Sequence, residues 1–340
     1  MRTWPAPAVL ARGASALILA LGLAACSGDE GPPRPDLEQV RQALALPRYR
    51  GPLKARVDRQ SGRRDLVLEW VSFEGRRDQR VPALVCYLEG ARFRPAPVVL
   101  CMPGSTNRKE DLIQPLDLLG RLAEAGFFAV SIDRPYHGQR PGNPDLAIRQ
   151  KGLGPVWGEY VYDLMRTIDY VATRSEADAD RLGILGLSLG GMEALLMAAL
   201  DPRVDVAVSV SGQVAWEPIF RAGAWPLLFG GLELTRQLQA RNAGAEEALS
   251  AFLSEMPELR VLDAAVLAPA LAPKPVLLIT GGEDPLAPPA AARHTFEQAL
   301  PGYRSGGMED HLALWIEPGA GHGLTRSMAT RAVAWLERWL

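Results

Sequence analysis

A serine on a predicted tight turn is the first residue of this chain that could do chemistry. Ser188 stands in Gly186-Leu-Ser-Leu-Gly190, after an apolar run that predicts a strand and before a run that predicts a helix. This is the pattern of a nucleophile elbow, which holds the hydroxyl out from the sheet at the start of a helix. Glycines at both ends let strand and helix cross closely. The pattern predicts a serine nucleophile.

A serine hydroxyl needs an adjacent base, and the base needs a carboxylate that fixes its tautomer. His322 follows the last predicted strand in the loop Pro318-Gly-Ala-Gly-His-Gly, which can bring the ring over the serine. Of the other histidines, His294 lies in a predicted surface helix, His311 precedes the last strand and His137 precedes the serine. We therefore expect His322 to be the base.

The carboxylate is expected after the preceding strand, in Gly281-Gly-Glu-Asp284-Pro285. Asp284 follows that strand by three residues, and Pro285 stiffens the turn behind it. Glu283 and Asp310 remain alternatives. The order Ser188, Asp284, His322 along the chain is that of α/β-hydrolases.

Catalysis by a serine also needs donors for the oxyanion that forms on the substrate. One expected donor is the backbone N–H of Leu189, directly after the nucleophile. The other is expected from Ser105, in the loop Cys101-Met-Pro-Gly-Ser105 after the third strand. The alternative for this loop is a simple Pro-Gly turn with no role in the reaction.

The elements that must position these residues alternate along the chain. Eight short runs rich in Val, Ile and Leu predict strands, at 66–73, 81–88, 97–101, 127–132, 181–187, 204–210, 275–280 and 312–316. Helical patterns lie between them, including 109–125, 161–171 and 324–340. Apolar strands that alternate with helices predict an α/β fold with an eight-stranded, mostly parallel sheet and helices on both faces.

One connection is too long for a simple crossover. About 60 residues separate the strand ending near Ser211 from the strand opening at Pro275, whereas connections in α/β units usually have about 2–6 residues. We predict a helical insertion over about 213–270, either a packing layer or a lid that shapes a substrate pocket. Its aromatic residues are Trp216, Phe220, Trp225, Phe229 and Phe252.

Several segments resemble the dienelactone-hydrolase and prolyl-oligopeptidase-like branch of the α/β-hydrolases. They are Asp180 to Gly191, Leu200 to Val206 and Lys274 to Gly281, with Asp133-Arg-Pro-Tyr-His137-Gly138 similar to a loop whose histidine is structural in that family. The resemblance implies an α/β-hydrolase fold over roughly residues 60–340. It also implies a serine hydrolase, which we expect to cleave a carboxylic ester, with a short acyl chain.

The sequence departs from the family's patterns in ways that disfavour some of the family's activities. The nucleophile is a serine where true dienelactone hydrolases have cysteine, the oxyanion loop reads Met-Pro-Gly, and no β-propeller precedes the domain. The last departure disfavours an oligopeptidase. A peptidase or amidase of the same fold remains one alternative, and a non-catalytic envelope lipoprotein that uses the fold for binding remains another.

The N-terminus predicts export. Met1-Arg2 and Arg12 precede a short apolar run, and Leu23-Ala-Ala-Cys26 resembles the lipobox of bacterial lipoproteins. We expect residues 1–25 to be a signal peptide, Cys26 to be lipidated, 26–50 to be a tether and 51–340 to be the hydrolase domain. The protein would be anchored in the bacterial envelope, with the outer membrane favoured. An ordinary secretory signal is the alternative.

Composition excludes several other classes of protein. Of 37 basic residues, removal of the signal takes two, leaving 35 against 39 acidic residues and a net charge of −4, which does not suit a nucleic-acid surface. No cofactor or metal is implied, because the few His and Cys show no ligand spacing. We expect Cys86 and Cys101 to be buried thiols, with a disulfide as the alternative.

Overall fold

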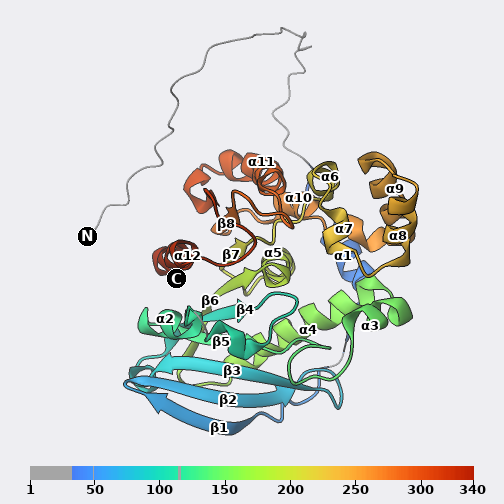
Figure 1. Ribbon diagram of the computed structural model, residues 1–340. Coiled ribbons are helices and arrows are strands. Elements are labelled where there is room, and N and C mark those ends of the chain that lie inside the picture. Colours follow the sequence, from blue (N-terminus) through green and yellow to red (C-terminus); the bar gives the residue numbers. More distant parts are fainter. Residues whose placement is uncertain (1–32, 49, 114–115) are drawn as a thin grey trace. The chain divides into compact units, whose positions relative to one another are not determined.

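The computed structural model describes residues 33–48, 50–113 and 116–340, and its centre is one twisted sheet (Figure 1). The strands are β1 Arg56–Arg63, β2 Leu66–Glu74, β3 Arg80–Leu88, β4 Ala96–Met102, β5 Phe128–Ile132, β6 Ala177–Leu187, β7 Val206–Val210, β8 Val276–Gly281 and β9 Leu312–Glu317. Their order in the sheet is β1-β2-β3-β5-β4-β6-β7-β8-β9. The α/β class is confirmed, with one strand more than we predicted.

The sheet has an antiparallel part and a parallel part. β1, β2, β3 and β5 pair antiparallel, and β5, β4, β6, β7, β8 and β9 pair parallel. The chain passes from β4 outward to β5 on one side and then to β6 on the other side of β4. The carboxyl ends of β4 and β6 therefore flank a topological switch point, where open α/β sheets place their ligand sites.

Helices cover both faces of the sheet. The α-helices are α1 Leu37–Ala43, α2 Leu118–Glu124, α3 Pro144–Lys151, α4 Leu153–Val171, α5 Leu189–Leu200, α6 Trp216–Arg221, α7 Trp225–Leu228, α8 Glu233–Ala240, α9 Ala245–Glu255, α10 Ala264–Leu267, α11 Pro289–Ser305 and α12 Arg326–Trp339. Side chains of α2 and α12 share one hydrophobic core, and those of α4, α5 and α11 share the other. The parallel strands are thus buried on both faces, as their apolar sequences require.

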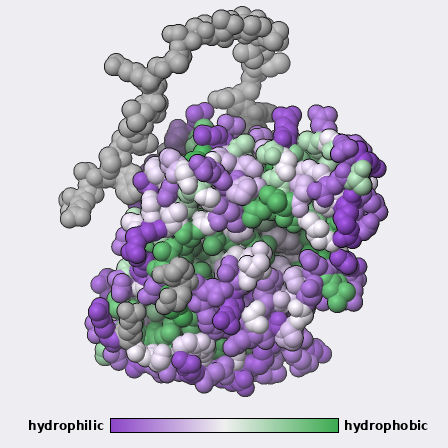
Figure 2. All heavy atoms as spheres, viewed as in Figure 1, coloured by the Kyte–Doolittle hydropathy of each residue, from purple (hydrophilic) through white to green (hydrophobic). Residues whose placement is uncertain are grey.

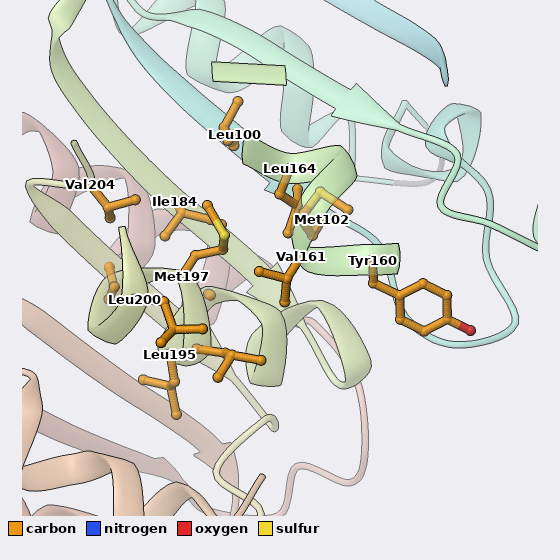
Figure 3. Close-up of a cluster of buried hydrophobic side chains, with 14 of the residues drawn as sticks. Leu100, Met102, Tyr160, Val161, Leu164, Ile184, Leu195, Met197, Leu200 and Val204 are labelled. Atoms are coloured by element: carbon orange, nitrogen blue, oxygen red, sulfur yellow. The ribbon is translucent and has the colours of Figure 1, made fainter. Parts of the chain in front are cut away.

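The core beside α5 fixes the start of that helix against the sheet. Figure 3 shows side chains of β4 and β6 meeting those of α4 and α5, with Leu100, Ile184, Val161 and Leu195 among them. Each of these four residues is 1% exposed or less. Such packing leaves the strand-to-helix turn at Ser188 little freedom.

One predicted helix was wrong in its extent. We expected a helix over 109–125, but the chain forms a single 3₁₀ turn at Lys109–Leu112 and α2 begins only at Leu118. Pro115 lies in the middle of the predicted range. Proline has no N–H to donate and disfavours a helical residue before it, so its presence in the sequence argues against one continuous helix over this range.

Between β7 and β8 the chain forms a group of helices, α6 to α10, which gather together in Figure 1. Two 3₁₀ turns, Pro257–Arg260 and Ala268–Ala270, lie among them. Phe220, Phe229 and Phe252 pack ring against ring, with Phe229 and Phe252 centroids 4.6 Å apart. The insertion therefore has an aromatic core of its own.

The segment expected to be a tether is partly built into the domain. Asp36 caps α1 by accepting hydrogen bonds from the backbone N–H groups of Glu38 and Gln39, and Val40 and Leu44 are buried beside α4 and α5. From α1 onward the chain thus packs as part of the domain. Residues 1–32, including the predicted signal peptide and Cys26, lie outside the described residues. No helix in the described ranges has the length and hydropathy needed to cross a bilayer.

Candidate active site

Ser188 sits on a strained turn between β6 and α5. Its backbone has φ 55° and ψ −117°, a conformation that costs energy for a residue with a side chain and that recurs at functional sites. A Cβ on Gly186 would lie 1.9 Å from the Gly190 carbonyl oxygen, and one on Gly190 would lie 2.3 Å from that of Met102. Only glycine fits at either position, so the glycines expected from the elbow pattern permit the close crossing.

The structure brings the three predicted triad residues together. The His322 Nε2 atom lies 2.9 Å from the Ser188 hydroxyl oxygen, and His322 Nδ1 lies 3.0 and 2.9 Å from the two carboxylate oxygens of Asp284. Asp284 is fully buried, and the His322 side chain is 21% exposed. A base between a hydroxyl and a buried carboxylate can accept the serine proton while its tautomer stays fixed.

The surroundings of Asp284 keep it charged. Its Oδ1 atom accepts hydrogen bonds from the backbone N–H groups of Leu286 (2.9 Å) and Ala287 (2.8 Å). Burial alone would raise the pKa of Asp284, but the hydrogen bonds from His322 and Ala287 outweigh it, and the pKa lies below its ordinary value. A carboxylate in this state can stabilise the imidazolium that forms during catalysis.

The alternative acids lie elsewhere. Glu283 is exposed, with its backbone N–H bonded to the Ala320 carbonyl. Asp310 is paired with Arg338 at 2.8 Å, and its side chain is 60% exposed. Neither carboxylate is hydrogen-bonded to His322.

The remaining histidines and the cysteines also lie apart from the triad. His137 Nδ1 lies 2.8 Å from the Pro135 carbonyl oxygen, His311 is bonded to the Pro273 carbonyl, and His294 is part of α11. Cys86 and Cys101 are buried, free thiols on β3 and β4, which are separated by β5. In the described part of the chain, no group of three His, Cys, Asp or Glu side chains could hold a metal ion.

Both predicted oxyanion donors line the cavity that contains Ser188 and His322. Leu189 is the first residue of α5, so its N–H has no intrahelical acceptor. Ser105 comes from the loop after β4, and a Cβ on the preceding Gly104 would lie only 3.8 Å from the Ser188 Cβ. Leu189 and Ser105 thus lie beside the nucleophile, one on a helix and the other on a loop.

The cavity beside Ser188 has a volume of about 200 Å³ and mostly apolar walls. Trp216, Leu228 and Phe229 come from the insertion, whereas Trp157 and Met192 come from α4 and α5. Figure 2 shows hydrophobic surface gathered across the middle of the viewed face, where Figure 1 draws α5 and α7. The insertion therefore contributes walls to the cavity in addition to its own packing.

Sequence reasoning missed a second group of residues around the site. Arg134, after β5, forms a buried ion pair with Glu193 of α5 and also reaches the oxyanion loop. A signal was present, because Glu193 is the only charged residue in an otherwise apolar helix, where an acid needs a partner.

Comparisons with known proteins identify the families to which the sequence is related. The prolyl oligopeptidase family model matches residues 156–340, more than half of the chain, and the dienelactone hydrolase family model matches residues 85–224.

The chain belongs to the prolyl oligopeptidase family.

Curated relatives of the chain include hydrolases and esterases. “Putative hydrolase YtaP” of Bacillus subtilis is 27% identical, over 82% of this chain and 94% of its own length. Esterase YjfP of Escherichia coli is 26% identical, over 79% of this chain and all of its own length. The esterase relatives and the match to the dienelactone hydrolase family model place the protein among the serine ester hydrolases.

Solved structures share the fold at low sequence identity. Acetyl xylan esterase 1 from Thermoanaerobacterium superposes with a TM-score of 0.63 at 19% identity, over 91% of this chain and 95% of that one. A glucuronoyl esterase from Solibacter usitatus gives a TM-score of 0.61 at 13% identity, over 89% and 92%. The likeness establishes the α/β-hydrolase fold.

Proposed function

We propose that this prolyl oligopeptidase family member hydrolyses a short-chain carboxylic ester through an acyl-enzyme on Ser188. The hydrogen-bonded chain from Ser188 through His322 to Asp284 supports this proposal most directly. His322 removes the serine proton as the oxygen attacks the ester carbonyl, and the negative charge passes to the carbonyl oxygen. The N–H groups of Ser105 and Leu189 stabilise that charge.

The intermediate then collapses with cleavage of the ester bond, and the proton on His322 passes to the departing alcohol. A water molecule attacks the acyl-Ser188 ester in the second half of the cycle. It gives its proton to His322, and the carboxylic acid leaves as the proton returns to the Ser188 oxygen. Asp284 keeps His322 in the required tautomer through both halves.

The size of the cavity favours a short acyl group. Its volume of about 200 Å³ lies below the roughly 300–1,000 Å³ that is typical of small-molecule sites. Trp216 and Phe229 are held by ring contacts within the insertion, so the walls are bulky side chains that are themselves supported. We assign this cavity to the acyl group.

Nitrophenyl esters of graded acyl length test the activity and the chain-length preference together. We expect hydrolysis that peaks below about eight carbons and that is abolished by Ser188→Ala. A maximum at ten carbons or beyond would contradict the short-chain assignment. Labelling by a fluorophosphonate, lost in Ser188→Ala, separates an active serine hydrolase from a binding module that keeps only the fold.

An amidase of the same fold is the enzymatic alternative. Nitrophenyl esters and nitroanilides with the same acyl group differ in the bond cleaved. Faster cleavage of the anilide would replace the esterase assignment with a peptidase or amidase.

We further propose that the protein is attached to the bacterial envelope by lipid on Cys26, with the outer membrane favoured. The support is the sequence alone: a basic start, a short apolar run and Leu23-Ala-Ala-Cys26. The first described helix, α1, begins only 11 residues after Cys26. The attachment would thus lie a short chain length from the folded domain.

A further inference from the structure

We infer that Arg134 positions the oxyanion hole by fixing the peptide between Gly104 and Ser105. The inference rests on the proposed function, because it assigns the Ser105 N–H to the developing oxyanion. Arg134 does not touch the reacting atoms and acts through the backbone of the loop. It is therefore a positioning residue.

The guanidinium of Arg134 binds the carbonyl side of the loop. Its Nη1 donates to the Gly104 carbonyl oxygen at 2.9 Å, and its Nη2 donates to the Pro103 carbonyl oxygen at 2.7 Å. Arg134 is 1% exposed, so these bonds are shielded from water. Two successive carbonyls thus point at one buried cation.

The orientation of the carbonyl determines the orientation of the next N–H. In a trans peptide the C=O and N–H groups point in opposite directions, and among the described residues the single cis bond is Ala272-Pro273. Because the Gly104 carbonyl points at Arg134, the Ser105 N–H of the same peptide points away from Arg134. Ser105 lines the cavity with Ser188, and a Cβ on Gly104 would lie 3.8 Å from the Ser188 Cβ. On this ground we take the Ser105 N–H to face the cavity.

The same guanidinium is bound to the helix that follows the nucleophile. Arg134 Nε and Nη2 each lie 2.8 Å from an oxygen of the Glu193 carboxylate, which is fully buried on α5. Arg134 therefore joins the loop that presents the Ser105 N–H to the helix that presents the Leu189 N–H. The Gly104 carbonyl also accepts a hydrogen bond from the Asn107 backbone N–H at 3.3 Å, but that bond stays within the loop. Arg134 adds the link between the loop and α5.

The loop that contains Arg134 is itself firmly held. Asp133 accepts hydrogen bonds from the backbone N–H and the Nζ of Lys109 at 3.0 and 2.7 Å, which ties down the far end of the oxyanion loop. Farther along, Arg140 forms a buried ion pair with Asp163 of α4. These contacts hold the backbone on both sides of Arg134 in place.

A comparison of two buried ion pairs tests the assignment. Arg134→Met/Glu193→Gln removes the pair that binds the oxyanion loop, and the control Arg140→Met/Asp163→Asn removes a buried pair from the same loop. Loss of one oxyanion donor costs about 10²–10³ in kcat. We expect the first variant to lose about 10- to 10³-fold in kcat with KM within about threefold, and the control to stay within about threefold in both constants.

A transition-state analogue gives a readout that loss of stability would not move. An alkyl trifluoromethyl ketone adds to Ser188 and places a negative oxygen in the hole. Its affinity should fall in parallel with kcat/KM in the Arg134 variant only, although both variants lower Tm. If the two variants lose activity equally, or if only KM changes, the inference is overturned.

Kinetics of a second variant and a crystal structure test the role of Arg134 in other ways. If the double variant does not fold, Arg134→Lys keeps a cation opposite Glu193 but cannot donate to both loop carbonyls as well, and the same loss of kcat at constant KM is expected. A crystal structure of the variant needs no turnover: an unrotated Gly104–Ser105 peptide would overturn the inference even if the proposed esterase activity were absent. Failure of the wild type to hydrolyse any ester would count against the proposed function instead.

Discussion

Two adjacent carboxylates follow β8, and their surroundings separate them. Asp284 is buried, accepts two backbone hydrogen bonds and reaches His322, whereas Glu283 is exposed. The chemistry of the two side chains is nearly the same. Position on the turn therefore decides which of them can orient the base.

Asp284→Asn should leave a folded protein that still binds substrate, with kcat reduced by about 10³–10⁴, because an amide at this position favours the wrong tautomer of the imidazole. Glu283→Gln is the matched control and should cost less than about tenfold. Steady-state kinetics of both variants on one nitrophenyl ester make the comparison. If the order of severity is reversed, or if Asp310→Asn is the damaging change, the acid belongs elsewhere.

The two buried thiols should be unreactive in the native protein. Burial is the main cause that raises the pKa of Cys86 to about 12, and burial also raises the pKa of Cys101. At pH 8 both therefore stay protonated, and thiolate is the reactive form. Ellman's reagent at pH 8 should label neither of these cysteines until denaturant is added. Rapid labelling of either in the native protein would contradict their burial.

Among single residues, the sequence predicted those that follow a strand or belong to a motif. Ser188 and His322 could be found because each lies beside glycines directly after an apolar run. Arg134 could not be assigned, because its partners are the carbonyls of Pro103 and Gly104 and the acid Glu193. Glu193, alone among apolar residues, signals that it needs a buried partner, but the sequence does not show which cation pairs with it. Contacts with distant backbone carbonyls leave no pattern of side-chain types.

At the scale of elements, the insertion between β7 and β8 forms part of the wall of the cavity. Trp216, Leu228 and Phe229 reach the wall, and Phe220 and Phe252 support them from behind. Removing a wall ring should enlarge the space for the acyl group, whereas removing an exposed residue of the same segment should not.

Phe229→Ala should shift the preferred acyl length upward by two or more carbons. Leu227→Ala is the control, since Leu227 lies in the same segment but is 61% exposed and does not line the cavity. The measurement is kcat/KM across a series of nitrophenyl esters. An unchanged profile in Phe229→Ala would mean that the acyl group binds elsewhere.

Element prediction succeeded where apolar residues recur and failed where they do not. The eight predicted strands all contain apolar runs, which are buried or half-buried in the structure. The missed strand, β1, reads Arg-Val-Asp-Arg-Gln-Ser-Gly-Arg and is largely exposed at the sheet edge. β1 is held by backbone pairing with β2, interrupted by an irregularity between Val57 and Arg59. Backbone hydrogen bonds are the same for every residue type, so they left no hydrophobic period to detect.

At the scale of the whole molecule, the proposed attachment to a membrane rests on the sequence of the N-terminus. Cys26→Ser should move the protein from the detergent phase into the soluble periplasmic fraction and abolish incorporation of labelled fatty acid. Esterase activity of the released protein should be unchanged, because the triad lies far along the chain from this residue. A wild-type protein that is already soluble and takes up no fatty acid would exclude lipidation.

The positions of the triad along the chain also determine at which stage of folding activity can appear. Ser188 follows β6, Asp284 follows β8, and His322 follows β9, 134 residues after Ser188. A chain synthesised from its N-terminus presents its nucleophile long before its base exists, and pairing of distant strands is slow. A chain that is unfinished or only partly folded would thus have no esterase activity. In refolding, the return of ester hydrolysis should follow the slowest phase of tryptophan fluorescence. The rate at which activity returns would then report the pairing of β9 with β8.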